Sequence, residues 1–192
     1  MTSRAIIVEQ VKNQLAGGKA PANFPITDQE IGKKVDQITN DIIAINCMED
    51  ILCDDYCLPF EDVEILLDAA LNKYYCVLPA AVISLPRQKG VWQVSSMQDQ
   101  SLPYVSIGTQ GASRYKADLA DLLQGNVGYY YQQGKLFFEN YNPALNTTTL
   151  LVKLIVDRSY LEDEDSYCVP GNIEKMIVEK TFETFPGYSS KK

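Results

Sequence analysis

A capped helix with a regular apolar stripe is the sequence feature that most restricts how this chain folds. Thr27 is followed three residues later by Glu30, the pattern of a capping box, in which each side chain binds the backbone N–H of the other residue. Apolar residues then recur at alternating spacings of four and three: Ile31, Val35, Ile38, Ile42 and Ile45. A stripe this narrow buries one side of a helix. It predicts packing against another helix, in the same subunit or in a neighbouring one.

Three further segments have helical patterns of apolar residues. The first follows Ser3 as a possible N-cap and ends at Gly17 and Gly18. The last begins near Pro170, a residue favoured in the first turn of a helix. The predicted ranges are 3–15, 61–74 and 172–184.

From residue 80 onward the apolar period changes to two, which predicts strands. Residues 80–85 and 91–95 are expected to form one hairpin, and residues 127–131 and 135–139 a second. A short edge strand is predicted at 103–107, an inserted helix at 114–123, and a strand at 148–157. Because the last of these strands is apolar on both faces, we expect it to be covered on both sides.

The order of these elements predicts an α+β fold. It has N-terminal amphipathic helices, a mostly antiparallel β-sheet with hairpins and one inserted helix, and a C-terminal helix. We expect an N-terminal helix and linker at 1–25, a single domain at 26–188 and a tail at 189–192.

Composition excludes several kinds of chemistry. The 192 residues include no His, which excludes Ser-His-Asp and Cys-His nucleophile systems and His-ligated zinc. The net charge is -8, so sequence-specific nucleic-acid binding and attachment to anionic membranes are not expected. No apolar run approaches the roughly 20 residues of a membrane helix or resembles a signal peptide, which favours a cytosol-like compartment.

Five cysteines, an odd number, argue against a disulfide framework and favour buried thiols. Cys53 and Cys57 have a spacing that zinc sites allow, but no second short pair accompanies them. An all-cysteine zinc site therefore stays open as the less favoured alternative, and we expect no cofactor.

Two clusters of side chains suggest binding, and each has a simpler structural explanation. The acidic residues between Glu49 and Glu64 could bind a hard cation, but they lack an alternating Asp pattern with a central Gly, so solvated surface charge is favoured. The aromatic residues at 129–131 and 137–138 could stack on nucleic-acid bases. Few cations are interleaved with them, so a role in the core or in a subunit interface is favoured.

The second predicted hairpin carries little charge, only Lys135 and Glu139. Uncharged strand edges must be covered or paired, and addition to the sheet of a neighbouring copy is one solution. If one surface meets a different surface on the next copy and the rotation closes, the product is a ring.

Three segments resemble virion structural proteins of tailed phages, especially small ring or connector components of crAss-like bacteriophages. They are residues 78–91 (LPAAVISLPRQKGV), 128–138 (GYYYQQGKLFF) and 168–177 (CVPGNIEKMI), and the similarity extends over roughly residues 60–185. The resemblance implies a non-enzymatic part of the head-to-tail connector, assembled as a ring below the portal or within the tail barrel, around the DNA channel. An acidic protein suits that place, because a negative lumen lets DNA slide.

We therefore expect a homo-oligomeric virion protein, assembled in the bacterial cytoplasm, whose partners are its own copies, the portal and other connector or tail proteins. The expected interface residues are Ile31, Val35, Ile38, Ile42, Ile45, Tyr129, Tyr131 and Phe137. The alternatives are a monomeric adaptor that binds another protein, a tail-tube component and, least favoured, a metal-dependent enzyme.

Overall fold

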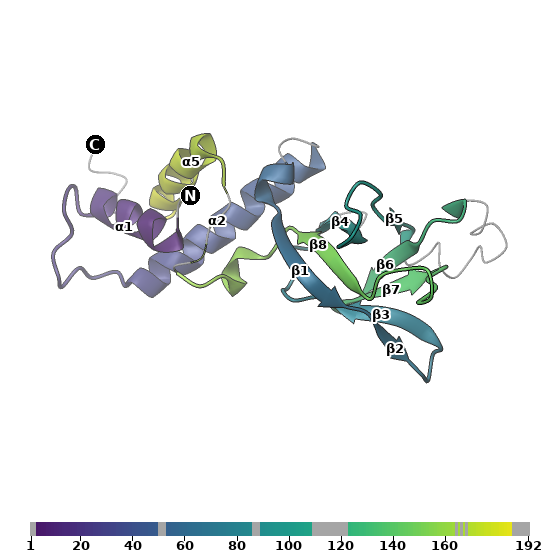
Figure 1. Cartoon of the computed structure of the whole chain (residues 1–192). Helices are drawn as coiled ribbons and strands as arrows, with labels where there is room; N and C mark the ends of the chain where they lie inside the picture. Colours follow the sequence, from purple (N-terminus) through teal and green to yellow (C-terminus); the bar gives the residue numbers. More distant parts are fainter. Residues whose placement is uncertain are drawn as a thin grey trace. The chain divides into compact units, whose positions relative to one another are not determined.

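The computed structural model describes residues 3–49, 53–85, 89–108, 123–163, 165, 167 and 169–185. The chain forms two compact units (Figure 1). Unit 1 combines Met1–Tyr56 with Asp157–Lys192, and unit 2 is Cys57–Val156. The fold class is α+β, as predicted. The expected division into 1–25 and 26–188 differs from this grouping, because the first helix shares a core with the two other helices of unit 1.

Unit 1 is built from three helices: α1 (Arg4–Leu15), α2 (Asp28–Met48) and α5 (Gly171–Glu183). Their apolar sides meet in one core, which also takes in the buried ring of Tyr167. The buried members of this core are Ile7, Val8, Val11, Leu15, Ile31, Val35, Ile42, Tyr167, Ile173, Ile177 and Val178. The predicted helices at 3–15 and 172–184 are therefore confirmed to within two residues.

Local hydrogen bonds set the ends of the first two helices. Thr27 Oγ1 accepts from the Glu30 N–H at 3.2 Å, and Glu30 Oε2 accepts from the Thr27 N–H at 2.9 Å, which confirms the capping box. α1 ends in a Schellman motif, in which the Gly18 N–H donates to Asn13 O while Gly17 has a φ of 71°. Ser3 is the N-cap of α1, as predicted, but its hydroxyl makes no capping hydrogen bond.

Unit 2 contains two sheets. The smaller sheet has the order β1-β8-β4, with β1 at Leu58–Glu64, β8 at Thr149–Leu154 and β4 at Val91–Ser96. The larger sheet has the order β2-β3-β7-β6-β5. Its strands are β2 (Leu66–Asp68), β3 (Lys73–Val77), β7 (Lys135–Glu139), β6 (Gly128–Gln132) and β5 (Val105–Ser106). β8 is buried on both faces, with Leu150 and Val152 on one and Leu151 on the other, which agrees with the prediction for residues 148–157.

Two segments of unit 2 take part in both sheets. Residues 58–68 pair with β8 through β1 and then with β3 through β2. Residues 103–106 pair with β4 through a Pro103–Ser95 bridge and a Tyr104 N–H to Val94 O hydrogen bond of 2.7 Å, and then with β6 through β5. The hydrogen-bonded strands therefore form a closed circuit within one chain, which leaves few open edges.

The predicted helix at 61–74 is wrong, because this segment forms β1, β2 and the start of β3. Two residues in it adopt positive φ, Asp62 at 55° and Asn72 at 49°, which a helix excludes. The Asp68 carboxylate accepts from the N–H groups of Ala70 and Leu71, so it forms a turn where a helix would need its own backbone bonds. The apolar residues that suggested a helix instead belong to a hairpin.

Of the two predicted hairpins, only the second forms. β6 and β7 pair around Gln133 and Gly134, but β4 pairs with β8 and not with residues 80–85. Those residues make only an isolated bridge, Val82 to Val156. The prediction that the β6–β7 hairpin leaves unpaired edges is wrong for β7, which pairs with β3 over residues 135–138, whereas β6 pairs with β5 only at Gly128 and Tyr129. The short β5 lies at the edge of its sheet, as predicted.

The predicted inserted helix at 114–123 falls almost entirely outside the described residues, as do residues 86–88 of the first predicted hairpin loop and the tail at 189–192.

Candidate interaction surfaces

The predicted interface stripe on α2 divides into a covered part and an exposed part. Ile31 and Val35 are fully buried against α1 and α5, and Ile42 is nearly so. Ile38 is half-buried, while 57% of the Ile45 side chain is exposed. Within one copy, Ile31, Val35 and Ile42 are therefore core, and only Ile45 and part of Ile38 are available to a neighbour.

A groove of about 620 Å³ lies between α2 and α5, and we call it the helix groove. Its lining residues are Ile38, Asp41, Ile42, Ile45 and Asn46 on α2, and Met176, Lys180, Glu183 and Thr184 on α5. Sequence reasoning found its three isoleucines but missed the α5 wall. The α5 wall could have been found from the spacing of Met176, Lys180 and Glu183, which places the three residues on one face of that helix.

The predicted interface residues on the strands are mostly internal. Tyr129 and Phe137 are buried, and Tyr131 is half-buried. Phe137 stacks on Tyr130 with ring centroids 5.5 Å apart. This arrangement favours the structural explanation of the aromatic cluster over base stacking, because two of its rings are already packed against each other.

The cations near these rings are also engaged within the chain. Lys73 Nζ donates to the Tyr130 hydroxyl at 3.1 Å and forms an ion pair with Glu139. Burial would lower the pKa of Lys73, but the bonds to Glu139 and Tyr130 outweigh it and raise the pKa. Lys135 Nζ lies 4.5 Å from the centroid of the Tyr75 ring.

A second apolar surface lies on the β2–β3 hairpin at one border of the larger sheet (Figure 1). Four side chains there are each 42–58% exposed: Leu66, Leu67, Leu71 and Val77. We call this set the hairpin surface. Sequence reasoning missed it because it assigned the leucines to the buried side of a helix.

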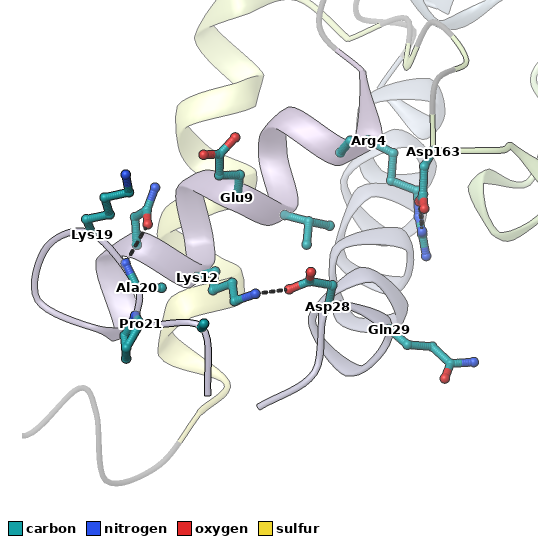
Figure 2. A pocket seen from close by; sticks show the side chains of 13 residues that line it. Arg4, Glu9, Lys12, Lys19, Ala20, Pro21, Asp28, Gln29 and Asp163 are labelled. Atoms are coloured by element: carbon teal, nitrogen blue, oxygen red, sulfur yellow. Dashed lines mark hydrogen bonds and ion pairs between the residues drawn. The ribbon is translucent and has the colours of Figure 1, made fainter. Parts of the chain in front are cut away.

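Another hollow of unit 1 lies beside α1 and has a volume of about 540 Å³. Figure 2 shows two ion pairs among its charged side chains, with Glu9 and Lys19 apart from them. Lys12 Nζ lies 2.7 Å from Asp28 Oδ1, and Arg4 forms an ion pair with Asp163. Because these charges are already paired, the pocket carries no argument for catalysis.

Cysteines and acidic residues do not gather into a metal site in the described part of the chain, where no group of three or more Cys, Asp or Glu side chains is placed to hold an ion. Cys47 and Cys76 are buried, in agreement with the prediction of buried thiols, whereas Cys57 is only half-buried. Burial raises the pKa of Cys76 to about 12. Asp50 and Cys168 lie outside the described residues, and the environment of the Cys53 side chain is not described either.

Among the described helices, none is both long enough and apolar enough to cross a membrane. No protein-family model matches the chain, and no curated protein matches its sequence.

Proposed function

We propose that the protein is a non-enzymatic structural subunit that assembles with further copies of itself, and that the assembly is a ring in the head-to-tail connector of a tailed phage. The ring would surround the DNA channel and contact the portal and other connector or tail proteins. The phage context comes from the resemblance of residues 78–91, 128–138 and 168–177. The net charge of -8 supports a channel position, since a negative lumen does not retain DNA.

The observation that carries the self-assembly is the hairpin surface. Its four apolar side chains lie within twelve residues of one another, each about half exposed, on the outermost hairpin of the larger sheet; Leu66 and Leu67 are consecutive on β2 and so lie on opposite faces of it. Apolar residues clustered on a surface mark an interaction site, whereas single exposed apolar residues do not. Burying the exposed half of each side chain against a neighbour stabilises the contact by roughly 1 kcal/mol.

The closed circuit of strands changes how such a ring would form. Edge-to-edge strand addition is one possible contact between copies, but most strand edges are paired within one copy, and β2 and the short β5 are the outermost strands of the larger sheet. Contacts between copies would therefore be made by side chains. The same circuit favours the alternative function, a monomeric adaptor, because unit 2 needs no neighbour to complete its sheets.

The test is the native mass of the purified protein by light scattering and sedimentation, with negative-stain images of the particles. We expect ring-shaped particles, and we expect the double substitution of Leu67→Asp and Leu71→Asp to abolish them without lowering the melting temperature. Leu145→Asp is the matched control, because Leu145 is 83% exposed and lies in the loop between β7 and β8, outside the set of residues that forms the hairpin surface. A monomer at all concentrations would support the adaptor.

A further inference from the structure

The helix groove exists because α2 is longer than the helices that cover it. α2 has 21 residues, whereas α1 has 12 and α5 has 13. At 1.5 Å per residue, α2 is about 31 Å long and its two partners are each about 20 Å or less. The last turns of α2 therefore extend past full helical cover, and Ile45 and Met48 are 57% and 60% exposed.

Charged side chains lie on both walls of the groove, one anion on the α2 wall and a cation and an anion on the α5 wall. Asp41 projects from α2 and Lys180 from α5, and both side chains are exposed. No ion pair within 4 Å joins either of them to another described residue. The groove is thus an apolar surface with an unpaired anion on one wall and an unpaired cation on the other, with Glu183 near its end.

A surface with this pattern is complementary to itself. If two copies face each other across a two-fold axis, Asp41 of each copy meets Lys180 of the other, and both charges are paired at once. In such a dimer the exposed Ile45, which lines the groove, and the exposed Met48 next to it are covered by the opposite copy. Met48 and Met176 are flexible side chains that adapt to such a contact.

We propose that the helix groove binds the same groove of a second copy of this chain around a two-fold axis. This inference rests on the self-assembly stated under the proposed function and names one of its contacts. A two-fold contact closes on itself and cannot by itself propagate a ring. The helix groove therefore forms the contact within a dimer, and the hairpin surface forms the contact that builds the ring.

The test uses two charge reversals in the full-length chain, Asp41→Lys and Lys180→Asp. In a two-fold dimer, each variant alone places two like-charged pairs across the interface. We expect each to weaken dimerisation at least about tenfold, because like charges placed opposite one another are unfavourable. An equimolar mixture of the two variants restores both opposite-charge pairs in the mixed dimer. We therefore expect the mixture to recover the wild-type dimerisation constant in sedimentation equilibrium.

Two matched controls carry the same charge changes on the outer side of α5. Lys175 and Glu179 are exposed, form an i,i+4 pair and do not line the groove. Lys175→Asp and Glu179→Lys should leave dimerisation unchanged. Circular dichroism melts of all four variants show whether the fold is intact.

The outcomes separate this inference from the proposed function. If wild-type protein assembles and the mixture fails to recover the dimer, the groove contact is wrong and a different partner or segment covers the groove, while self-assembly stands. If the mixture recovers a dimer but no larger particle forms, the groove contact is right and the ring is wrong. A wild-type monomer at every concentration overturns both.

Discussion

Tyr167 donates a hydrogen bond of 2.7 Å from its hydroxyl to Asp36 Oδ1, and both residues are buried in unit 1. Arg4 completes the arrangement with two bonds to the same carboxylate, from Nε to Oδ1 at 2.9 Å and from Nη2 to Oδ2 at 2.8 Å. Burial and the neighbouring Asp36 charge raise the pKa of Tyr167 and keep its hydroxyl protonated. The position of Arg4 explains why residue 32 of α2 is a glycine, because a Cβ there would lie 2.5 Å from Arg4 Nη2.

Replacing Tyr167 by Phe removes the donor and leaves Asp36 bound only by Arg4. A hydrogen bond to a charged group contributes about 1.5–3 kcal/mol, so the free energy of unfolding should fall by that amount. Urea denaturation at pH 7 measures it. Tyr160→Phe is the control. Because Tyr160 is 68% exposed, the loss of its hydroxyl should not measurably change the free energy of unfolding.

The capping box predicts a dependence of stability on pH. Hydrogen bonds from the Thr27 N–H and hydroxyl lower the pKa of Glu30 below its ordinary value of 4.5. Because the pKa of Glu30 is lower in the folded state, its carboxylate contributes to the free energy of unfolding above pH 4.5. This contribution is lost as the pH falls through the folded-state pKa. Wild type should therefore be more stable than Glu30→Gln at pH 7, and the difference should shrink at pH 3. An equal difference at both pH values would contradict this assignment.

The two parts of the α2 stripe should respond differently to the same substitution. Ile31 is fully buried, so Ile31→Ala should lower the free energy of unfolding by about 2–5 kcal/mol through lost burial and a cavity. Ile45 is mostly exposed, so Ile45→Ala should change the stability of the monomer by no more than about 0.5 kcal/mol. Chemical denaturation at a concentration below assembly measures both, and equal losses would show that Ile45 is covered within one copy.

The β6–β7 turn depends on left-handed backbone at two consecutive residues. Gln133 has a φ of 51° and Gly134 a φ of 76°. A Cβ at Gly134 would meet no atom within 4 Å, so Gly134→Ala isolates the conformational cost, which should be about 1–2 kcal/mol. Gln133→Asn should stabilise the turn, because Asn tolerates this conformation better than Gln. Thermal unfolding of the two variants should shift in opposite directions.

The Cys76 thiol should be unreactive in the folded protein. Burial raises its pKa to about 12, so almost no thiolate forms at pH 8, and reagents reach it only after unfolding. Alkylation at pH 8 followed by peptide mass mapping should label the half-buried Cys57 before Cys76. Labelling of both at the same rate in native buffer would contradict the buried position of Cys76.

The local sequence by itself determined the features whose interactions lie within a few residues. The capping box, the Schellman end of α1 and the β6–β7 turn all follow from side chains and backbone groups three to five positions apart. The α+β class and the isoleucines of the helix groove are also readable, because the apolar period reports the element type and its buried side.

Only the tertiary structure decided the fate of residues 61–74 and the partner of β4. Val63 and Glu64 pair with β8 about 85 positions away, the start of β3 pairs with β7 about 60 positions away, and β4 pairs with β8 about 60 positions away; these partners outweigh the weak helical preference of the segment. The end of the α2 stripe is exposed for a similar reason, since the length of α5, set more than 120 residues later, determines how much of α2 is covered. Local propensities differ by tenths of a kcal/mol per residue, whereas pairing and burial of a whole segment contribute several, so long-range contacts win wherever the two disagree.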